Sequence, residues 1–235
     1  MMKDWFLLLM RWGHFMAGIT WIGILYFYNL ANAKFFNTAN SNFMAGLDPQ
    51  TKIKVYPSLI TKTMWWFRWG ALWTVVFGLA MYGVYVPEHV SSQETRNALM
   101  MIGVLLFVVY VLNFYALSLT AADKNKPVHN LMIAFVIITI FAAFAFPYMT
   151  RANSYATTIT VGGGFGILMF LNVWGIIWRN QKKIIQSHID QGNGQPALPE
   201  LPKLAKVAGV ASRTNFWLSL PMLLMMAAAS HLNLP

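Results

Sequence analysis

Residues 11–27 read RWGHFMAGITWIGILYF, which places a cation, an imidazole and three glycines in an apolar run long enough to cross a bilayer. Ionisable groups at membrane depth are costly, and they usually face a bundle interior, a polar cavity or a cofactor. Five residues spaced three or four apart share one face of the predicted helix: Arg11, His14, Gly18, Trp21 and Leu25. His14 is therefore the first candidate for a functional residue. A hydrogen bond to a neighbouring helix is the structural alternative.

The composition is that of an integral membrane protein. Of the 235 residues, 57% are hydrophobic and 10% are charged, whereas about a quarter of a soluble domain is charged. The 17 Lys and Arg residues outnumber the 7 Asp and Glu residues, but no nucleic-acid recognition motif accompanies them. Membrane topology and anionic lipid explain this basic charge better than a nucleic-acid partner does.

The absence of cysteine from the sequence limits the chemistry. It excludes disulfides, iron–sulfur clusters, thiolate zinc and covalently attached haem. The apolar runs also contain no Ser-His-Asp, paired-carboxylate or zinc-hydrolase spacing. Histidine, carboxylate, Tyr and Met remain as ligands for a metal or cofactor.

Six apolar runs of about 20 residues predict an all-α fold, a polytopic transmembrane helix bundle. Only helices and closed barrels satisfy the backbone in lipid, and these runs lack the alternation of barrel strands. The predicted spans are about 5–31, 64–86, 98–121, 130–149, 157–178 and 212–230. We expect residues 1–235 to form a single integral membrane domain with long cytoplasmic loops at 32–63 and 179–211.

The distribution of basic residues predicts that both termini lie on the non-cytoplasmic side. Three cations lie in the predicted outer segments: Lys3, Arg96 and Arg151. Twelve lie after spans one, three and five: Lys34, Lys52, Lys54, Lys62, Lys124, Lys126, Arg179, Lys182, Lys183, Lys203, Lys206 and Arg213. Arg68 falls among tryptophans near the cytoplasmic end of the second span, where an interfacial anchor is expected.

The predicted depths along the spans place the candidate residues in the outer half of the membrane. His14 lies near the middle of span one, His231 at the outer end of span six, and His89 in the outer turn after span two. A glycine tract at 162–164, centred on Gly163, opens span five on the same side. Glycines lower helix stability, so we expect a flat group or another backbone to approach there.

Histidine on transmembrane helices without cysteine fits a non-covalently bound haem b. His14 is the predicted axial ligand, with His231 as the second ligand and His89 as its substitute. Arg11 is placed to pair with a propionate. Trp21 is expected to pack on the macrocycle edge, one turn deeper than the gap at Gly18.

Copper is the alternative occupant of the same site. Imidazole and thioether suit copper, so His14, His231 and nearby methionines could hold it. The 15 methionines are dispersed through apolar helices, however, where packing is their usual role.

Four blocks of the sequence resemble the N-terminal membrane domain of bacterial membrane urate oxidases. They are HFMAGITWIGILYF at 14–27, WWFRWGALWT at 65–74, NVWGIIWRNQKK at 172–183 and SRTNFWLSLPMLLMMAAASH at 212–231. The first block is also distantly similar to membrane protoporphyrinogen oxidases, which are haem proteins, and to copper-resistance D membrane proteins. The resemblance implies an oxidoreductase or electron-transfer subunit in the bacterial inner membrane, with haem b as cofactor and urate as the expected substrate class.

The resemblance also implies a partner. In that family the membrane domain is commonly followed by a cytochrome c domain outside the cytoplasm, and this sequence contains no C-x-x-C-H motif. We therefore expect electrons to pass to a separate cytochrome c or to other subunits of a membrane complex. The alternative is a non-catalytic accessory subunit that stabilises such a complex.

Overall fold

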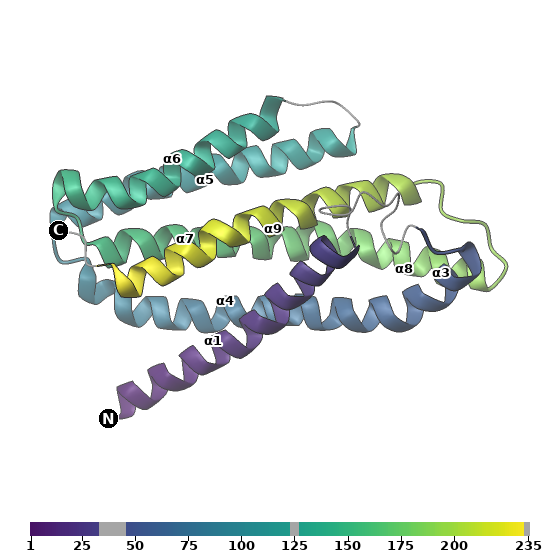
Figure 1. Cartoon of the computed structure of the whole chain (residues 1–235), viewed down its shortest axis with the longest axis horizontal. Coiled ribbons are helices and arrows are strands. Elements are labelled where there is room, and N and C mark those ends of the chain that lie inside the picture. The colour runs from purple at the N-terminus through teal and green to yellow at the C-terminus, as the bar shows by residue number, and fades with distance from the viewer. Residues whose placement is uncertain (33–45, 123–126, 233–235) are drawn as a thin grey trace. The chain divides into compact units, whose positions relative to one another are not determined.

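The computed structural model describes residues 1–32, 46–122 and 127–232, and every regular element in those ranges is a helix (Figure 1). The elements in chain order are α1 (Met2–Tyr26), η1 (Phe27–Asn32), α3 (Pro49–Val55), η2 (Tyr56–Ile60), α4 (Thr61–His89), α5 (Gln93–Ala121), α6 (Pro127–Thr150), α7 (Ser154–Asn172), η3 (Val173–Ile177), α8 (Trp178–Gly192) and α9 (Leu201–His231). The three η elements are short π-helices. The predicted all-α class is confirmed.

Five helical segments are long and apolar enough to cross a membrane: Met2–Ala31, Pro49–His89, Gln93–Ala121, Val128–Thr150 and Ser154–Gly192. They contain the first five predicted spans and confirm a multi-pass membrane protein. The sixth predicted span lies in α9, which is 31 residues long. Polar residues such as Arg213 and Asn215 lower its mean hydropathy, so α9 satisfies the length requirement but is not among these five segments. The structure thus supports five to six spans.

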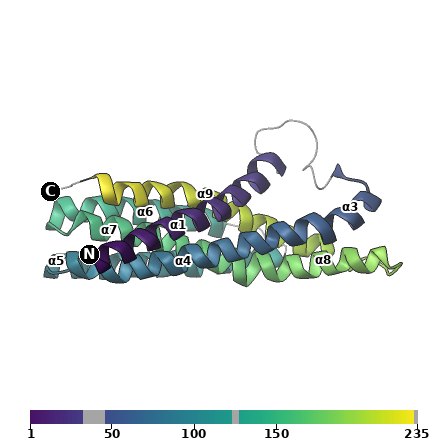
Figure 2. The same ribbon diagram turned by 90° about the horizontal axis from the view of Figure 1, so that it is seen from below.

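The described parts of the two segments predicted as long loops between spans are largely helical. Helix continues from α3 through η2 into α4, as Figure 2 shows. Residues 33–45 of the predicted loop 32–63 lie outside the described residues. In the other predicted loop, α8 extends to Gly192 and α9 begins at Leu201. Ile184 and Ile185 are buried on the otherwise polar α8. A window that averages hydropathy misses such an amphipathic helix.

Two side-chain caps fix where helices begin. The Ser92 hydroxyl accepts the Thr95 amide at 3.1 Å and starts α5, and the Asp48 carboxylate accepts the Thr51 amide at 3.0 Å and starts α3. Hydrogen bonds from the Thr51 side chain and amide lower the pKa of the Asp48 carboxyl. The charged form of Asp48 is therefore the form that caps α3.

The helices pack into two compact units. Unit 1 comprises residues 1–11, 75–169 and 217–235, and unit 2 comprises residues 12–74 and 170–216. Helices α1, α4, α7 and α9 each contribute residues to both. The helices α5 and α6 belong wholly to unit 1, where they lie side by side (Figure 1). The short helices α3 and α8 belong to unit 2.

Close backbone approaches organise the interior of unit 2. A Cβ placed on Gly70 of α4 would lie 3.2 Å from the Trp21 amide nitrogen and 3.3 Å from the Ala17 carbonyl oxygen of α1. Buried amides add polar contacts: the Asn172 side chain donates to the Asn215 side chain at 2.8 Å, and both residues are fully buried. Small residues and side-chain amides are the usual means of joining helices in lipid.

Candidate functional site

His14 lies on α1 in unit 2 and contacts the backbone of α4. Its Nδ1 is 2.8 Å from the Thr74 carbonyl oxygen. Because a carbonyl only accepts, Nδ1 carries the proton and donates it, and Nε2 keeps its lone pair. Metal-ligating histidines are oriented by the same kind of hydrogen bond from the second ring nitrogen. Nε2 forms no hydrogen bond with any described residue, so His14 has the tautomer that a metal ligand needs.

Gly18 and Trp21, one and two turns along α1 from His14, differ in how tightly the chain surrounds them. A Cβ on Gly18 would lie 3.9 Å from the Thr74 Cγ2 atom, an ordinary van der Waals distance, so packing does not require glycine there. The side chain of Trp21 is 1% exposed, and its buried Nε1 has no hydrogen-bond partner among the described residues. The chain itself therefore covers most of the Trp21 ring that we expected to pack on a cofactor.

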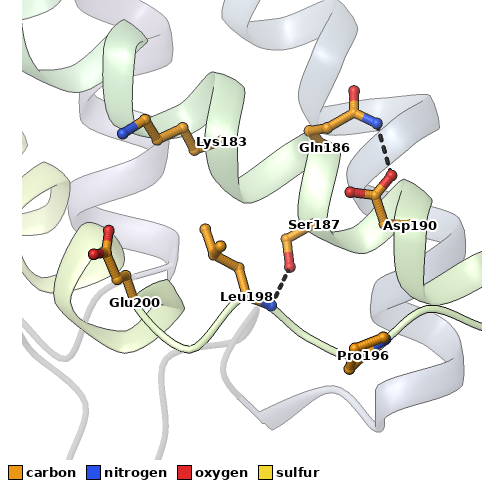
Figure 3. Close-up of a pocket in the computed structure, with 7 residues that line it drawn as sticks. All are labelled: Lys183, Gln186, Ser187, Asp190, Pro196, Leu198 and Glu200. Carbon is orange, nitrogen blue, oxygen red and sulfur yellow. Dashed lines mark hydrogen bonds between the residues drawn. The ribbon is translucent and has the colours of Figure 1, made fainter.

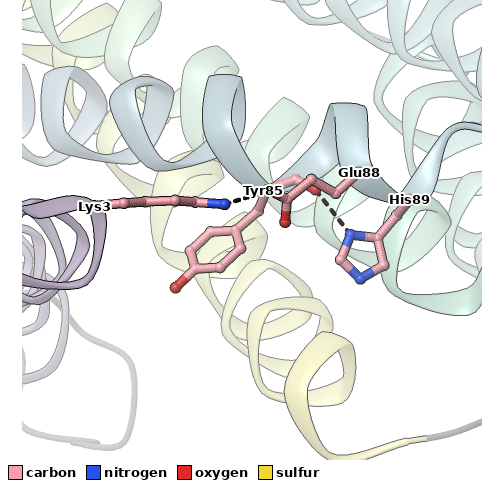
Figure 4. Close-up of polar contacts among 4 residues, drawn as sticks. All are labelled: Lys3, Tyr85, Glu88 and His89. Carbon is pink, nitrogen blue, oxygen red and sulfur yellow. Dashed lines mark hydrogen bonds and ion pairs between the residues drawn. The ribbon is translucent and has the colours of Figure 1, made fainter. Parts of the chain in front are cut away.

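Arg11 belongs to unit 1 and lies in a cluster of aromatic side chains. Its guanidinium donates to the Tyr85 hydroxyl at 2.7 Å. The Tyr85 ring lies 6.4 Å from the Tyr155 ring, which in turn lies 4.5 Å from the His89 imidazole. An ion pair between Lys3 and Glu88 borders this cluster (Figure 4). The polar end of unit 1 thus carries a cation and an imidazole joined by two tyrosines.

The other two candidate histidines share the tautomer of His14. Nδ1 of His89 donates to the Tyr85 carbonyl at 2.8 Å (Figure 4), and Nδ1 of His231 donates to the Ala227 carbonyl at 2.9 Å. In the neutral imidazole this arrangement leaves the lone pair on Nε2. His89 contacts Tyr155, near the start of α7, and the residue after His231 accepts a 3.5 Å hydrogen bond from the Ser154 hydroxyl. The structure brings both histidines to that end of α7. No group of three or more His, Asp or Glu suited to a metal occurs in the described ranges.

The glycine tract of α7 serves packing at two of its three positions. A Cβ on Gly162 would lie 3.1 Å from the Met225 Cβ, and one on Gly164 would lie 2.5 Å from a methyl group of Leu106. Gly163 differs, because a Cβ there would meet nothing within 4 Å. Helix packing accounts for the outer two glycines and leaves Gly163 facing open space.

A second polar cluster, in unit 2, surrounds Arg68 of α4. Its guanidinium carbon lies 3.9 Å from the centre of the Trp178 ring, 5.8 Å from Trp174 and 6.0 Å from Trp69. The Trp174 indole also donates to the Arg68 carbonyl at 3.2 Å. The guanidinium forms no ion pair or hydrogen bond within the described part of the chain. Tryptophan rings therefore enclose a cation that has no anionic partner there.

A cavity of about 320 Å³ lies farther along α8 in the same unit. It is lined by Lys183, Ser187 and Asp190 of α8 and by Leu198 and Glu200 of the following segment (Figure 3). The Ser187 hydroxyl accepts the Leu198 amide at 3.0 Å and holds that segment against α8. The lining carries charges of both signs and no imidazole or aromatic ring, so it lacks the groups that would hold a haem.

Comparison with protein families shows which family the chain belongs to. The family model described as urate oxidase N-terminal matches residues 1–234. The chain belongs to the urate oxidase N-terminal family. No curated protein and no solved structure matches it.

Membership of the urate oxidase N-terminal family confirms the resemblance carried by the four sequence blocks. Sequence reasoning did not find the hydrogen-bond partner of His14, because Thr74 is 60 residues away and contributes only a backbone carbonyl. It also missed the joining of Arg11 to His89 through Tyr85 and Tyr155. The one available signal was the repeated presence of aromatic residues near the predicted outer ends of the spans.

Proposed function

We propose that this member of the urate oxidase N-terminal family is a membrane oxidoreductase or electron-transfer subunit that holds haem b through His14. The hydrogen bond from His14 Nδ1 to the Thr74 carbonyl carries the proposal, since it leaves Nε2 free to ligate iron. The family match over residues 1–234 supports a redox role connected with urate.

The surroundings of the candidate residues fit a haem in several respects. In the neutral form of His89 and of His231 the lone pair lies on Nε2, so each stays a candidate for the second imidazole that the sequence predicts. Arg11 donates one hydrogen bond to Tyr85 and retains other N–H groups for a propionate. Gly163 leaves open space beside α7. When bound, haem b supplies one-electron chemistry, and the residues of this chain ligate, orient and exclude water.

The predicted topology suggests the side of the membrane on which an electron acceptor would bind. Basic residues concentrate after spans one, three and five, which assigns the ends carrying His89 and His231 to the outer side. Electrons would then leave toward a cytochrome c or another respiratory partner outside the cytoplasm. The sequence contains no cysteine to attach a haem c covalently, so this acceptor would be a separate domain or subunit.

An absorption spectrum of the purified protein tests the proposal. We expect a Soret band and a haem b pyridine haemochrome, both lost in His14→Ala and retained in His129→Ala, a matched control at the start of α6. We also expect urate-dependent reduction of an added cytochrome c to disappear with His14→Ala. A folded, colourless protein would overturn the haem assignment. Copper found by metal analysis and dependent on His14 would replace haem as occupant, and a metal-free protein needed only for assembly would be an accessory subunit.

A further inference from the structure

The starting observation is a partly buried cation whose Nε has no partner among the described residues. Arg68 lies within a membrane-spanning segment, and its Nε is buried without a hydrogen-bond partner. An arginine that only anchors a helix at the interface extends its head group to water or lipid phosphate. Leaving a buried charged donor unpaired costs free energy that an acceptor on a ligand would recover.

The atoms that lack partners include both donors and an acceptor. Four buried side-chain polar atoms are unpaired in the described residues, and all belong to unit 2: Trp21 Nε1, Arg68 Nε, Trp69 Nε1 and Gln181 Oε1. Three of them are donors, and the Gln181 oxygen is an acceptor. Gln181 follows Trp178 by three residues within α8, so the two share a face of that helix, and Trp178 contacts Arg68.

The local backbone explains why this face is so arranged. The π-helix η3 spans Val173–Ile177, directly before α8. A π-helix shifts the register of the side chains that follow it and occurs frequently at functional sites. Here Trp174 donates to the Arg68 carbonyl, while the Trp178 ring lies over the guanidinium. One tryptophan within the π-helix and one directly after it therefore contact the same arginine.

The guanidinium, the indole rings and the Gln181 oxygen determine which class of ligand can bind. A planar guanidinium fork pairs with adjacent acceptors on a flat anion, and indole rings stack on its face. A phosphodiester or an ionised propionate only accepts hydrogen bonds, so neither would satisfy the Gln181 oxygen. A heterocycle that alternates carbonyl and N–H groups satisfies the donors and the acceptor together. The side chains of Arg68, Trp178 and Gln181 are each partly exposed, whereas the Arg68 Nε and Gln181 Oε1 atoms are buried. A ligand therefore reaches these two atoms only if the side chains rotate.

We infer that Arg68, Trp178 and Gln181 form a recognition site for a planar oxopurine anion, the class to which urate belongs. This inference rests on the proposed function, because it names where that function's substrate binds. Arg68 pairs with the carbonyl edge, Trp178 stacks on the ring, and Gln181 accepts a ring N–H.

Equilibrium binding of urate to the purified full chain, measured by calorimetry, tests the site. Arg68→Gln is expected to weaken binding about 10- to 100-fold, the effect of losing a hydrogen bond to a charged group. Arg68→Lys is expected to weaken it as well, because the charge remains but the planar fork is lost. Arg179→Gln is the matched control: it removes an exposed cation next to Trp178 and is expected to leave affinity within twofold.

A second variant keeps the test decisive where Arg68→Gln fails to fold. Gln181→Leu removes the acceptor at similar volume and is expected to weaken urate binding about tenfold while preserving the thermal unfolding midpoint. Unchanged urate affinity in folded Arg68→Gln or Gln181→Leu would overturn the inference. Two other results would also overturn it. If the variants lose haem but keep their affinity for urate, the site serves a haem propionate. If they lose binding to phosphatidylglycerol vesicles but keep their affinity for urate, the site serves a lipid headgroup.

The two proposals fail in different ways. A haem-free protein that binds urate through Arg68 would refute the proposed function and support this site. A protein that contains haem and oxidises urate, but whose affinity for urate does not depend on Arg68, would support the proposed function and refute this site.

Discussion

Replacing Gly70 by Ala is expected to push α1 and α4 apart. The added Cβ would lie 3.2 Å from the Trp21 amide nitrogen and 3.3 Å from the Ala17 carbonyl oxygen. Both neighbours are backbone atoms of α1, so no side-chain rotation can make room. The helices must separate by a few tenths of an ångström, or the methyl group must be accommodated under strain.

The magnitude is the difference between two opposing effects. Alanine is favoured over glycine inside a helix by about 1 kcal/mol. Overpacking a well-packed interior costs about 1–3 kcal/mol. The net result is a destabilisation of up to about 2 kcal/mol. Thr74 follows Gly70 by one turn on α4, so the same separation lengthens the 2.8 Å hydrogen bond to His14 and lowers haem content.

Gly18→Ala is the matched control on the facing helix. Its Cβ would lie 3.9 Å from Thr74 Cγ2, so the substitution is expected to keep or raise stability by up to about 1 kcal/mol. The assay is thermal unfolding in detergent together with the ratio of Soret to protein absorbance. A Gly70→Ala protein with at least wild-type stability and haem content would refute the close approach. Lower haem content in a fully stable Gly18→Ala protein would indicate that Gly18 forms the gap for the cofactor.

Two further predictions concern the interiors of the two units. Gly164→Ala places a methyl group 2.5 Å from a leucine side chain and is expected to lower the unfolding midpoint. Gly163→Ala, whose methyl group would meet nothing within 4 Å, is expected to leave the midpoint unchanged. Equal midpoints for the two variants would contradict this packing. Asn172→Leu is expected to cost about 1–3 kcal/mol by removing the donor to Asn215, and the double variant with Asn215→Leu should recover part of the loss. Additive effects in an unfolding assay would show that the two amides do not interact.

The sequence predicts the spans well because apolar length is a direct requirement of the bilayer. It fails where helices are amphipathic. The α8 helix has a polar average composition but buries Ile184 and Ile185, and only periodicity could have revealed that face. The positions of the π-helices were also not predicted, and in η3 the Trp174 indole makes a tertiary hydrogen bond to the Arg68 carbonyl that no local pattern reveals.

The candidate site was only partly predictable for a related reason. His14 is conspicuous because an imidazole in an apolar run needs a partner. That partner is a carbonyl, which every residue has, so no pattern of side chains could identify Thr74. Arg68 was predicted as an interfacial anchor, and that role stays a prediction. Its missing acceptor becomes visible only when the tryptophans around it are placed.

A single segment of α4 connects the two proposals. Arg68 and Thr74 are six residues apart, about 9 Å along the helix axis at 1.5 Å per residue. Between them lies Gly70, whose missing side chain lets α1 approach and brings His14 to the Thr74 carbonyl. One end of the segment thus orients the proposed iron ligand, and the other carries Arg68, the cation proposed to bind the anionic substrate. Because Gly70 faces α1 whereas Arg68 contacts tryptophans of α4, η3 and α8, a change at Gly70 should alter haem content through His14 and leave urate binding at Arg68 intact.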